Sequence, residues 1–459
     1  VLFDLNRYSF SVFSKEARKL LVLALPMLLA QVAQVGIGFV DTVMAGGAGK
    51  DDLAAVALGS SVFITVYVTF MGVMTALNPM ISQLYGSRKY AEVGETGRQG
   101  IWFGLMLGVI GMLLIWLLIW PFQVFLDLSE NTEHRMMQYM VFAGLAMPAA
   151  MIHRSLHAYA SSLNRPRVIM VVSFAAFLLN IPLNYMFVYG KLGMPELGGA
   201  GCGVATAIVF WFNAAALWLY VTKQHYFKQF GLKDRFSRPD KQVLKKIWKL
   251  GLPIGFSFFL EVSLFTFIVF LVARLGEDYV AAQQVVISLT GIIYMIPQSV
   301  GAAATVRVGY SLGMGNRERA RYISGVSLLV GLALALCTAL ALIILRQPLV
   351  GMYTNDVHVL EIATAVLLFA AIFQLPDCVQ CVASYALRGY KVARIPMLIH
   401  GVAFWGFGLL PGYWLAFYQD MGIYGFWTAL AVSLTIAAIA LVWYLEICSR
   451  AFAIEKRIV

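Results

Sequence analysis

Twelve long apolar segments fill most of this 459-residue chain, and they constrain its fold more than any other feature. A helix crosses the hydrocarbon core of a bilayer with about 20 predominantly apolar residues, and every segment reaches that length. The segments are apolar without interruption, whereas the strands of an outer-membrane barrel alternate apolar and polar residues. The sequence therefore predicts an all-α polytopic membrane protein with twelve transmembrane helices. The predicted helices cover residues 17–45, 53–85, 98–122, 136–160, 168–190, 200–223, 248–274, 280–312, 321–345, 358–387, 395–417 and 422–448.

The basic residues are distributed unevenly between the two sides of the predicted membrane domain. The formal net charge is +11, which by itself would also suit a nucleic-acid-binding protein. If the N-terminus is cytoplasmic, 27 of the 34 Lys and Arg residues lie in the termini and the even-numbered loops, as the positive-inside rule requires. We therefore expect no nucleic-acid partner, and a bacterial inner-membrane location with both termini cytoplasmic. Seven basic residues lie elsewhere: Lys50, Arg135, Lys191, Arg274 and Arg346 in the opposite loops, and Arg154 and Arg307 within helices.

An internal repeat relates the two halves of the chain. A shift of 227 residues places "LALPMLLAQ" over "LGLPIGFSF" and aligns Pro26 with Pro253. Each half holds six predicted helices, an even number, so an axis along the membrane normal should relate the halves. We predict an N-terminal lobe at 1–222, a cytoplasmic linker at 223–247 and a C-terminal lobe at 248–459, as two pseudo-symmetric six-helix lobes around a central cleft. This organisation is typical of transporters that work by alternating access, although duplication also builds channels and membrane enzymes.

Three carboxylates lie inside predicted helices, where a charged side chain costs about 2.5–3.5 kcal/mol on insertion scales. Asp41 closes helix 1, Glu261 lies in helix 7 and Asp377 lies in helix 10. Asp356 lies near the outer mouth of helix 10 and is a weaker candidate, because an interfacial Asp is usually solvated. An acid that the shared scaffold required would occur in both halves, so these acids indicate an added function. Their counterparts under the shift of 227 are all neutral: Ile268, Gln34 and Ala150.

Small and polar residues share helix faces with the acids. Such stripes can line a cavity, or they can pack one helix against another, and for a single Ser, Gly or Gln packing is the better interpretation. A buried carboxylate instead needs a cation, a proton or a base, and the predicted helices offer few bases. The faces are Gln31, Gln34, Gly38 and Asp41 on helix 1; Gln284, Ser288, Gly291, Tyr294 and Gln298 on helix 8; and Gln374, Asp377, Cys381 and Ser384 on helix 10.

The acids on helices 7 and 10 are therefore predicted to bind a cation or a proton. Burial favours the neutral form of a carboxyl group, so a proton and a sodium ion can compete for one site, and the sequence leaves the choice open. Tyr294 can supply an oxygen ligand or a cation–π contact, or be an ordinary interior tyrosine. The histidines suggest no metal site: His153 and His157 share a face without a carboxylate, and His400 is expected to be peripheral or to pack.

Four motifs resemble the multidrug and toxic compound extrusion family over the whole chain. They are "ALPMLLAQVAQVGIGFVDTVMAG" at 24–46, "GLPIGFSFFLE" at 251–261, "YMIPQSVGAAATVRVGYSLG" at 294–313 and "LPDCVQCVASYALRGYK" at 375–391. Within the family, the bacterial NorM-like branch fits best, with a neisserial member as the nearest match.

The resemblance implies an antiporter in which inward sodium or proton flow drives cationic, often aromatic compounds outward. It associates the coupling cation with Glu261, Asp377 and Tyr294, the two carboxylates being the ligands of a sodium ion. It implies coupling or drug contact for Asp41. No cofactor is expected besides the coupling ion, and the expected partners are organic cations, sodium or protons and membrane lipids, for a monomeric protein. Three further residues would line the outward-facing drug path: Gln284, Ser288 and Asp356.

Two other functions, a lipid flippase and a membrane enzyme, fit the sequence less well than multidrug efflux. A lipid-linked oligosaccharide flippase can share the two-lobe architecture, but its phosphates would favour basic residues in the cleft, where the candidates here are acids. An enzyme is disfavoured because the chain contains no H-E-x-x-H, G-x-S-x-G or G-x-x-x-x-G-K-[ST] motif. Without a nucleotide-binding loop, the energy for transport must come from an ion gradient or a partner protein.

Overall fold

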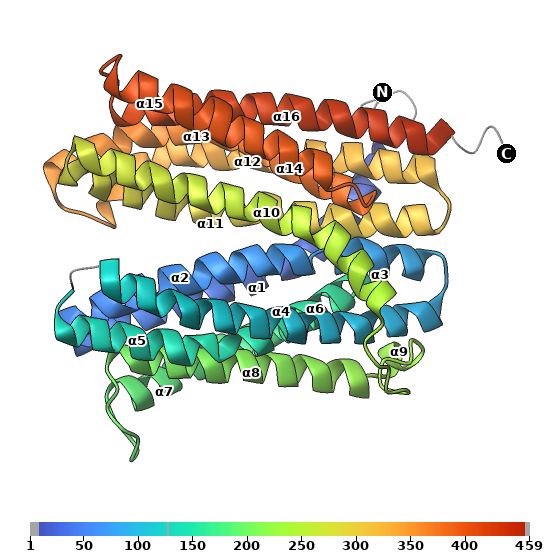
Figure 1. Ribbon diagram of the computed structural model, residues 1–459. Coiled ribbons are helices and arrows are strands. Elements are labelled where there is room, and N and C mark those ends of the chain that lie inside the picture. The colour runs from blue at the N-terminus through green and yellow to red at the C-terminus, as the bar shows by residue number, and fades with distance from the viewer. Residues whose placement is uncertain (1–8, 126–127, 455–459) are drawn as a thin grey trace. The chain divides into compact units, whose positions relative to one another are not determined.

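The structure, a computed structural model, describes residues 9–125 and 128–454, which form helices and no strand (Figure 1). The elements are α1 Phe10–Ala48, α2 Lys50–Met74, α3 Leu77–Gly86, α4 Tyr90–Phe125, α5 Glu130–Gly144, α6 Ala146–Ser162, α7 Arg167–Val188, α8 Gly199–Lys223, α9 His225–Lys228, α10 Lys241–Val272, η2 Ala273–Leu275, α11 Glu277–Gly313, α12 Arg317–Gly351, α13 Val357–Gly389, α14 Arg394–Gly401, η3 Val402–Leu409, α15 Leu410–Phe417 and α16 Ile423–Ile454.

The twelve membrane spans predicted from the sequence are confirmed. Twelve helical segments of the described chain are long and apolar enough to cross a membrane. Four of them are not single regular helices: α2 and α3 form one span, α5 and α6 form another, α10 and the 3-10 segment η2 form the seventh, and α14, η3 and α15 form the eleventh, in which η3 is π-helical. The long helices extend beyond the predicted apolar windows, because their polar ends continue into the loops.

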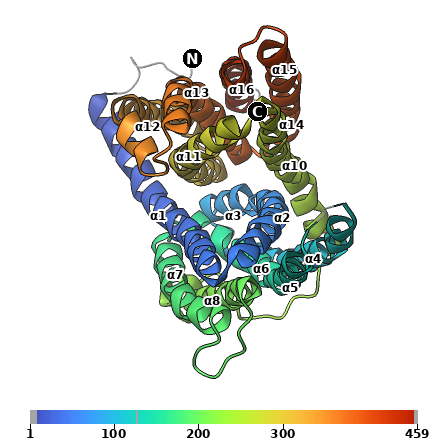
Figure 2. The same cartoon turned by 90° about the vertical axis from the view of Figure 1, so that its left-hand side faces the viewer.

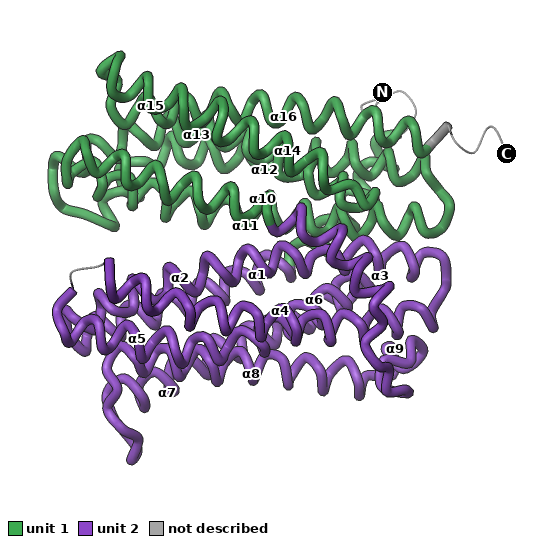
Figure 3. The backbone as a smooth tube through the Cα atoms, viewed as in Figure 1, with its two compact units in different colours: residues 1–25, 256–459 green, residues 26–255 purple. Residues whose placement is uncertain are grey.

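The helices group into two compact units (Figure 3). Unit 1 comprises residues 1–25 and 256–459, and unit 2 comprises residues 26–255. Helices α1 and α10 therefore each contribute to both units, and the first boundary falls at Pro26. The lobe and linker boundaries expected from the sequence stay a prediction.

Unit 2 is a bundle of α2–α8 with most of α1, seen along the helices in Figure 2. Its closest packing joins α4 to α6, α2 to α5, and α8 to α5, α6 and α7. Glycine makes the α4–α6 contact possible, because a Cβ added at Gly108 would overlap the Pro148 Cα. Small residues at such crossings let helix backbones approach closely, which is how helices associate in lipid.

Unit 1 is centred on α13, which packs against α11, α12 and α16. Its apolar core includes Ile268, Val286, Val366 and the fully buried rings of Phe426 and Trp427. The Trp427 indole N–H donates to Gln283 Oε1 over 2.8 Å, so the polar atom of this core ring is satisfied.

The segment between α9 and α10 is held against α4 by specific hydrogen bonds within unit 2. The Arg98 guanidinium donates to the Gly231 carbonyl over 2.5 Å and to the Ser237 hydroxyl over 2.8 Å. The Trp102 indole N–H donates to the Ser237 carbonyl over 2.9 Å. A Cβ at Gly94 would overlap the Phe230 carbonyl oxygen, so only glycine permits this approach. The basic connection is therefore an ordered part of unit 2.

Candidate functional site

Unit 1 brings three of the predicted site residues into one cluster. Glu261 comes from α10, Tyr294 from α11 and Asp377 from α13. The Tyr294 hydroxyl donates to Glu261 Oε2 over 3.4 Å, and the carboxyl groups of Glu261 and Asp377 interact electrostatically. The thiol of Cys381, on the predicted polar face of α13, interacts with both carboxyl groups. Asp377 is 6% exposed, whereas Glu261 and Tyr294 are half-buried.

Two prolines interrupt the backbone hydrogen bonds of the helices that carry this cluster. Pro297 lies in α11 three residues after Tyr294, and Pro376 lies in α13 directly before Asp377. Proline has no N–H, so the carbonyl groups four residues earlier lose their usual helical donor. Non-helical backbone polarity at membrane depth is tolerated where it is buried in protein or lines a cavity. The carbonyl groups affected are those of Ile293 and Ile372, four residues before Pro297 and Pro376.

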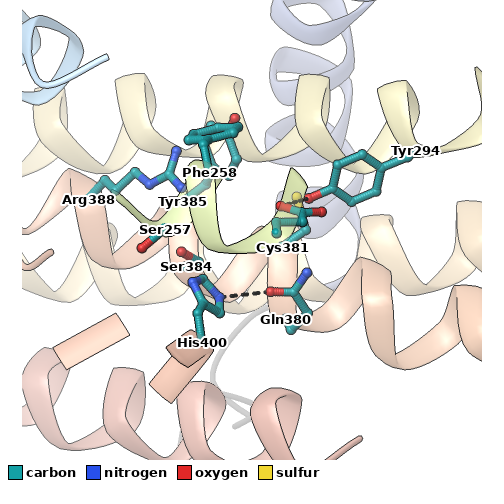
Figure 4. A pocket seen from close by; sticks show the side chains of 10 residues that line it. Ser257, Phe258, Tyr294, Gln380, Cys381, Ser384, Tyr385, Arg388 and His400 are labelled. Atoms are coloured by element: carbon teal, nitrogen blue, oxygen red, sulfur yellow. Dashed lines mark hydrogen bonds between the residues drawn. The ribbon is translucent and has the colours of Figure 1, made fainter. Parts of the chain in front are cut away.

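A pocket lies beside the cluster, with walls from α10, α11, α13 and α14 (Figure 4). Asp377 reaches it through Gln380, whose amide donates to Asp377 Oδ1 over 3.0 Å. The Gln380 carbonyl oxygen lies 2.9 Å from His400 Nε2. Figure 4 shows Tyr294 at one end of this pocket and Arg388 at the other. The lining residues are Ser257, Phe258, Glu261, Tyr294, Gln380, Cys381, Ser384, Tyr385, Arg388 and His400.

Sequence reasoning missed five polar members of this pocket: Ser257, Gln380, Tyr385, Arg388 and His400. Gln380 carried no signal of its own, and His400 was expected to pack or to lie at the periphery. Arg388 was counted among the loop residues, because predicted helix 10 ended at residue 387. The signal was nonetheless present, since Ser384 and Arg388 are one helical turn apart and extend the polar face of α13.

Asp41 occupies a separate polar site in unit 2. Its Oδ1 accepts hydrogen bonds from the amides of Asn184 over 2.6 Å and Asn180 over 3.1 Å. Its Oδ2 accepts from the Thr206 hydroxyl over 3.1 Å. The carboxyl group is therefore held by α7 and α8, and Asp41 is 6% exposed. The sequence analysis identified the acid but none of its three donors, which are neutral residues that cost little inside a helix.

The remaining predicted residues lie on the exposed surface of unit 1. Gln284 and Ser288 are exposed on α11, and the Ser288 hydroxyl lies 3.1 Å from the Tyr353 hydroxyl. Asp356 is the exposed N-cap of α13, where its Oδ1 accepts from two backbone N–H groups over 2.9 and 3.2 Å. The structure gives Asp356 a structural task, and its place on a drug path stays a prediction.

The described residues contain no group of three or more His, Cys, Asp or Glu side chains that could hold a metal ion. Glu261 and Asp377 supply only two such side chains, and the Tyr294 hydroxyl donates to the first of them. Two flexible ligands are too few to form a closed structural metal site, which has four.

The MatE family model matches the chain twice, at residues 26–186 and 253–414. The two matches begin 227 residues apart, which is the shift found in the sequence. The probable multidrug resistance protein NorM of Neisseria meningitidis serogroup A is 70% identical over 450 residues, covering 98% of both chains. The probable multidrug resistance protein NorM of Chromobacterium violaceum is 51% identical over 454 residues, again covering 98% of both chains. The predicted likeness to a neisserial member is confirmed.

Solved structures agree with the sequence relatives. The structure of the MATE transporter NorM-NG, in a complex that includes a monobody, has a TM-score of 0.82, 63% identity and 95% coverage of both chains. The eukaryotic MATE transporter AtDTX14 has a TM-score of 0.87 over 97% of this chain at 20% identity, which shows the common fold alone. The chain is therefore a multi-pass membrane transporter of the MatE family, the multidrug and toxic compound extrusion proteins, and not an enzyme.

Proposed function

We propose that this transporter is a multidrug efflux antiporter, which exports cationic, often aromatic compounds while sodium ions or protons flow inward. The observation that carries the proposal is the cluster of Glu261, Asp377 and Tyr294 within one bundle. Asp377 is buried and interacts electrostatically with Glu261, and such acids need compensating positive charge, which an ion from an electrochemical gradient can supply. The names of the relatives support the drug side of the proposal, because they are multidrug resistance proteins.

The proposed cycle uses opposed binding of drug and cation. A cation from outside binds at Glu261 and Asp377 and neutralises them, and the drug loses its electrostatic partner and leaves. After the protein turns inward, the cation dissociates and a new drug binds. The cycle requires only that the two ligands prefer different states or oppose each other at a shared site. Asp41, with its three donors, is a second candidate for coupling or drug contact.

The direction of transport follows from the proposed topology. The positive-inside pattern places both termini in the cytoplasm of a bacterial inner membrane, so the inward cation gradient drives export. We expect the protein to act as a monomer, with Gln284, Ser288 and Asp356 along the outward drug path. A lipid-linked oligosaccharide flippase is disfavoured, because an anionic phosphate would be repelled by two carboxylates.

Drug efflux from proteoliposomes tests the proposal. Sodium and pH gradients are imposed separately, and the wild type is compared with Glu261→Gln and Asp377→Asn. We expect at least one gradient to drive efflux of a fluorescent organic cation in the wild type, and both variants to lose that coupling. Glu361→Gln and Asp278→Asn are matched controls, because these acids of the same unit are exposed.

Three results would count against the proposal. If neither the sodium gradient nor the pH gradient drove drug efflux by the wild type, the protein would not be an antiporter for these ions. Unchanged coupling in both carboxylate variants would remove the site assignment. Movement of a fluorescent phospholipid-linked substrate, without movement of the organic cation, would favour the flippase.

A further inference from the structure

Arg388 is a buried cation without an acidic partner at contact distance. It is 5% exposed, and no carboxylate of the described residues lies within ion-pair distance of it. Its guanidinium instead lies over the rings of Tyr385, at 3.9 Å from the centroid, and Phe258, at 5.1 Å. Its Nη1 atom is buried without a hydrogen-bond partner. The half-buried Arg307 of unit 1 differs, since it pairs with Glu16.

The nearest counter-charge to Arg388 is the candidate cation site itself. Arg388 and Glu261 line the same pocket and interact electrostatically across it. Glu261 in turn interacts with Asp377. The two aromatic rings hold the guanidinium away from the carboxylates, and cation–π contact stabilises it there. The carboxylate oxygens therefore remain available to another cation, although a positive charge is permanently nearby.

The hydrogen bonds of the other polar groups in the pocket involve neutral forms, and His400 Nδ1 is buried without a partner. The Gln380 amide donates to Asp377, so its carbonyl oxygen is left to accept from His400 Nε2. This network fits the neutral imidazole with its hydrogen on Nε2. The Tyr294 phenol donates to Glu261 and needs no ionisation to do so. The fixed charges of the cluster are therefore two carboxylates and one guanidinium.

We propose that Arg388 is the internal counter-cation of the coupling site and limits the site to one monovalent cation for each drug exported. With both carboxylates ionised, the three charges sum to −1, and a single sodium ion or proton neutralises them. Net charge is strongly disfavoured in a low-dielectric interior, so one cation is accepted and a second is opposed. A guanidinium suits this role because it keeps its proton at every accessible pH. The inference rests on the proposed antiport and deepens it.

Charge balance gives each variant its own expected stoichiometry. Arg388→Met leaves two carboxylates without a counter-cation and should bind two cations. Glu261→Gln leaves Asp377 balanced by Arg388 and should bind none. Combining the two substitutions leaves one unbalanced carboxylate, so the double variant should regain the single cation that Glu261→Gln loses. Arg388→Lys keeps the charge and should remain at one.

The experiment measures the drug gradient that each protein sustains at equilibrium in proteoliposomes with the membrane potential clamped at zero. The logarithm of the drug ratio is plotted against the logarithm of the imposed sodium ratio, and in a second series against the proton ratio. The sum of the two slopes gives the cations moved per drug, whichever ion is used. We expect about one for the wild type and Arg388→Lys, about two for Arg388→Met, and about zero for Glu261→Gln. The double variant should return to about one.

Sodium-22 binding and proton uptake by the purified proteins repeat the count without requiring transport. Gel filtration establishes that each variant is folded, and Arg388→Gln replaces Arg388→Met if the latter aggregates. A wild-type sum near two would overturn the proposal, even if every variant were inactive. A sum that stays at one after Arg388 is neutralised would overturn it while leaving antiport intact. If no gradient drove efflux by the wild type, the proposed function itself would be refuted, and not only the role of Arg388.

Discussion

Tyr294→Phe separates the contribution of this residue to the fold from its contribution to cation binding. The hydroxyl donates to Glu261 Oε2 over 3.4 Å, which is longer than the 2.5–3.0 Å of a good O–H···O bond. A bond this long contributes only about 0.5 kcal/mol to stability, well below the ~1.5–3 kcal/mol of a good hydrogen bond to a charged group. The ring itself is retained, so the packing of α11 is unchanged. We expect the variant to fold with the stability of the wild type.

The effect on cation affinity should be much larger. A hydroxyl that orients a ligating carboxylate, or ligates the ion directly, typically changes metal affinity by about 10–100-fold when it is removed. A tenfold loss corresponds to about 1.4 kcal/mol, well above the expected change in stability. The assay is the initial rate of drug efflux as a function of the sodium or proton concentration, from which the half-saturating concentration is obtained.

Tyr413→Phe is the matched control, because this ring packs against Phe417 in α15 of the same unit. We expect the half-saturating concentration to rise at least about tenfold in Tyr294→Phe and to stay unchanged in Tyr413→Phe. An unchanged value in Tyr294→Phe would refute the assignment of the hydroxyl to the cation site. A loss of thermal stability as large as the loss of affinity would show that the hydroxyl acts on the fold instead.

Three further substitutions test other parts of the structure. Arg98→Ala should increase tryptic cleavage of residues 229–240 severalfold over the wild type, because the guanidinium holds this segment; equal cleavage rates would contradict the docking. Asp356→Asn keeps an N-cap and removes a charge, so the KM for a cationic drug should rise at unchanged stability, whereas Asp356→Ala should also lose about 1 kcal/mol of stability. Asn184→Ala removes the shortest donor to the buried carboxylate of α1 and should cost about 1.5–3 kcal/mol in thermal unfolding. Asn213→Ala should cost less, since both polar side-chain atoms of Asn213 are buried without partners; equal losses would mean that the measurement reports packing.

The membrane spans and the acids were predictable because both carry a large free-energy signal. Apolar stretches of this length have few alternatives to crossing a bilayer, and a carboxylate within one is expensive enough to stand out. Helical spacing then placed Asp377 and Cys381 on one face, and the structure has both near Glu261. The interruption of the second span between α2 and α3 also had a signal, although the sequence analysis did not use it: Pro79 lies four residues after Thr75 and cannot donate to its carbonyl group.

The partners of the acids were not predictable, for two physical reasons. Asn180, Asn184 and Thr206 are neutral, so their presence in apolar helices costs little, and they lie more than 130 residues from Asp41 in the sequence. Arg388 lies in the last turn of α13, where a basic side chain normally faces headgroups and interacts favourably with the helix dipole. Only the packing of α10 against this turn, through Phe258, shows that its guanidinium turns inward.

The repeat adds an argument about the charges of the pocket that neither half provides alone. Under the shift of 227, Tyr294 aligns with Tyr67, so the aromatic hydroxyl belongs to the scaffold that both halves share. Glu261 and Arg388 align with the neutral residues Gln34 and Ser161. A basic residue needed only to end a helix would be expected in both halves, as would an acid needed only for packing. The acid and the arginine are instead specific to the C-terminal half, and they line one pocket there. Glu261 and Arg388 therefore occur together in one half of the chain. This is expected if each balances the charge of the other, because either charge alone would be costly in a membrane bundle.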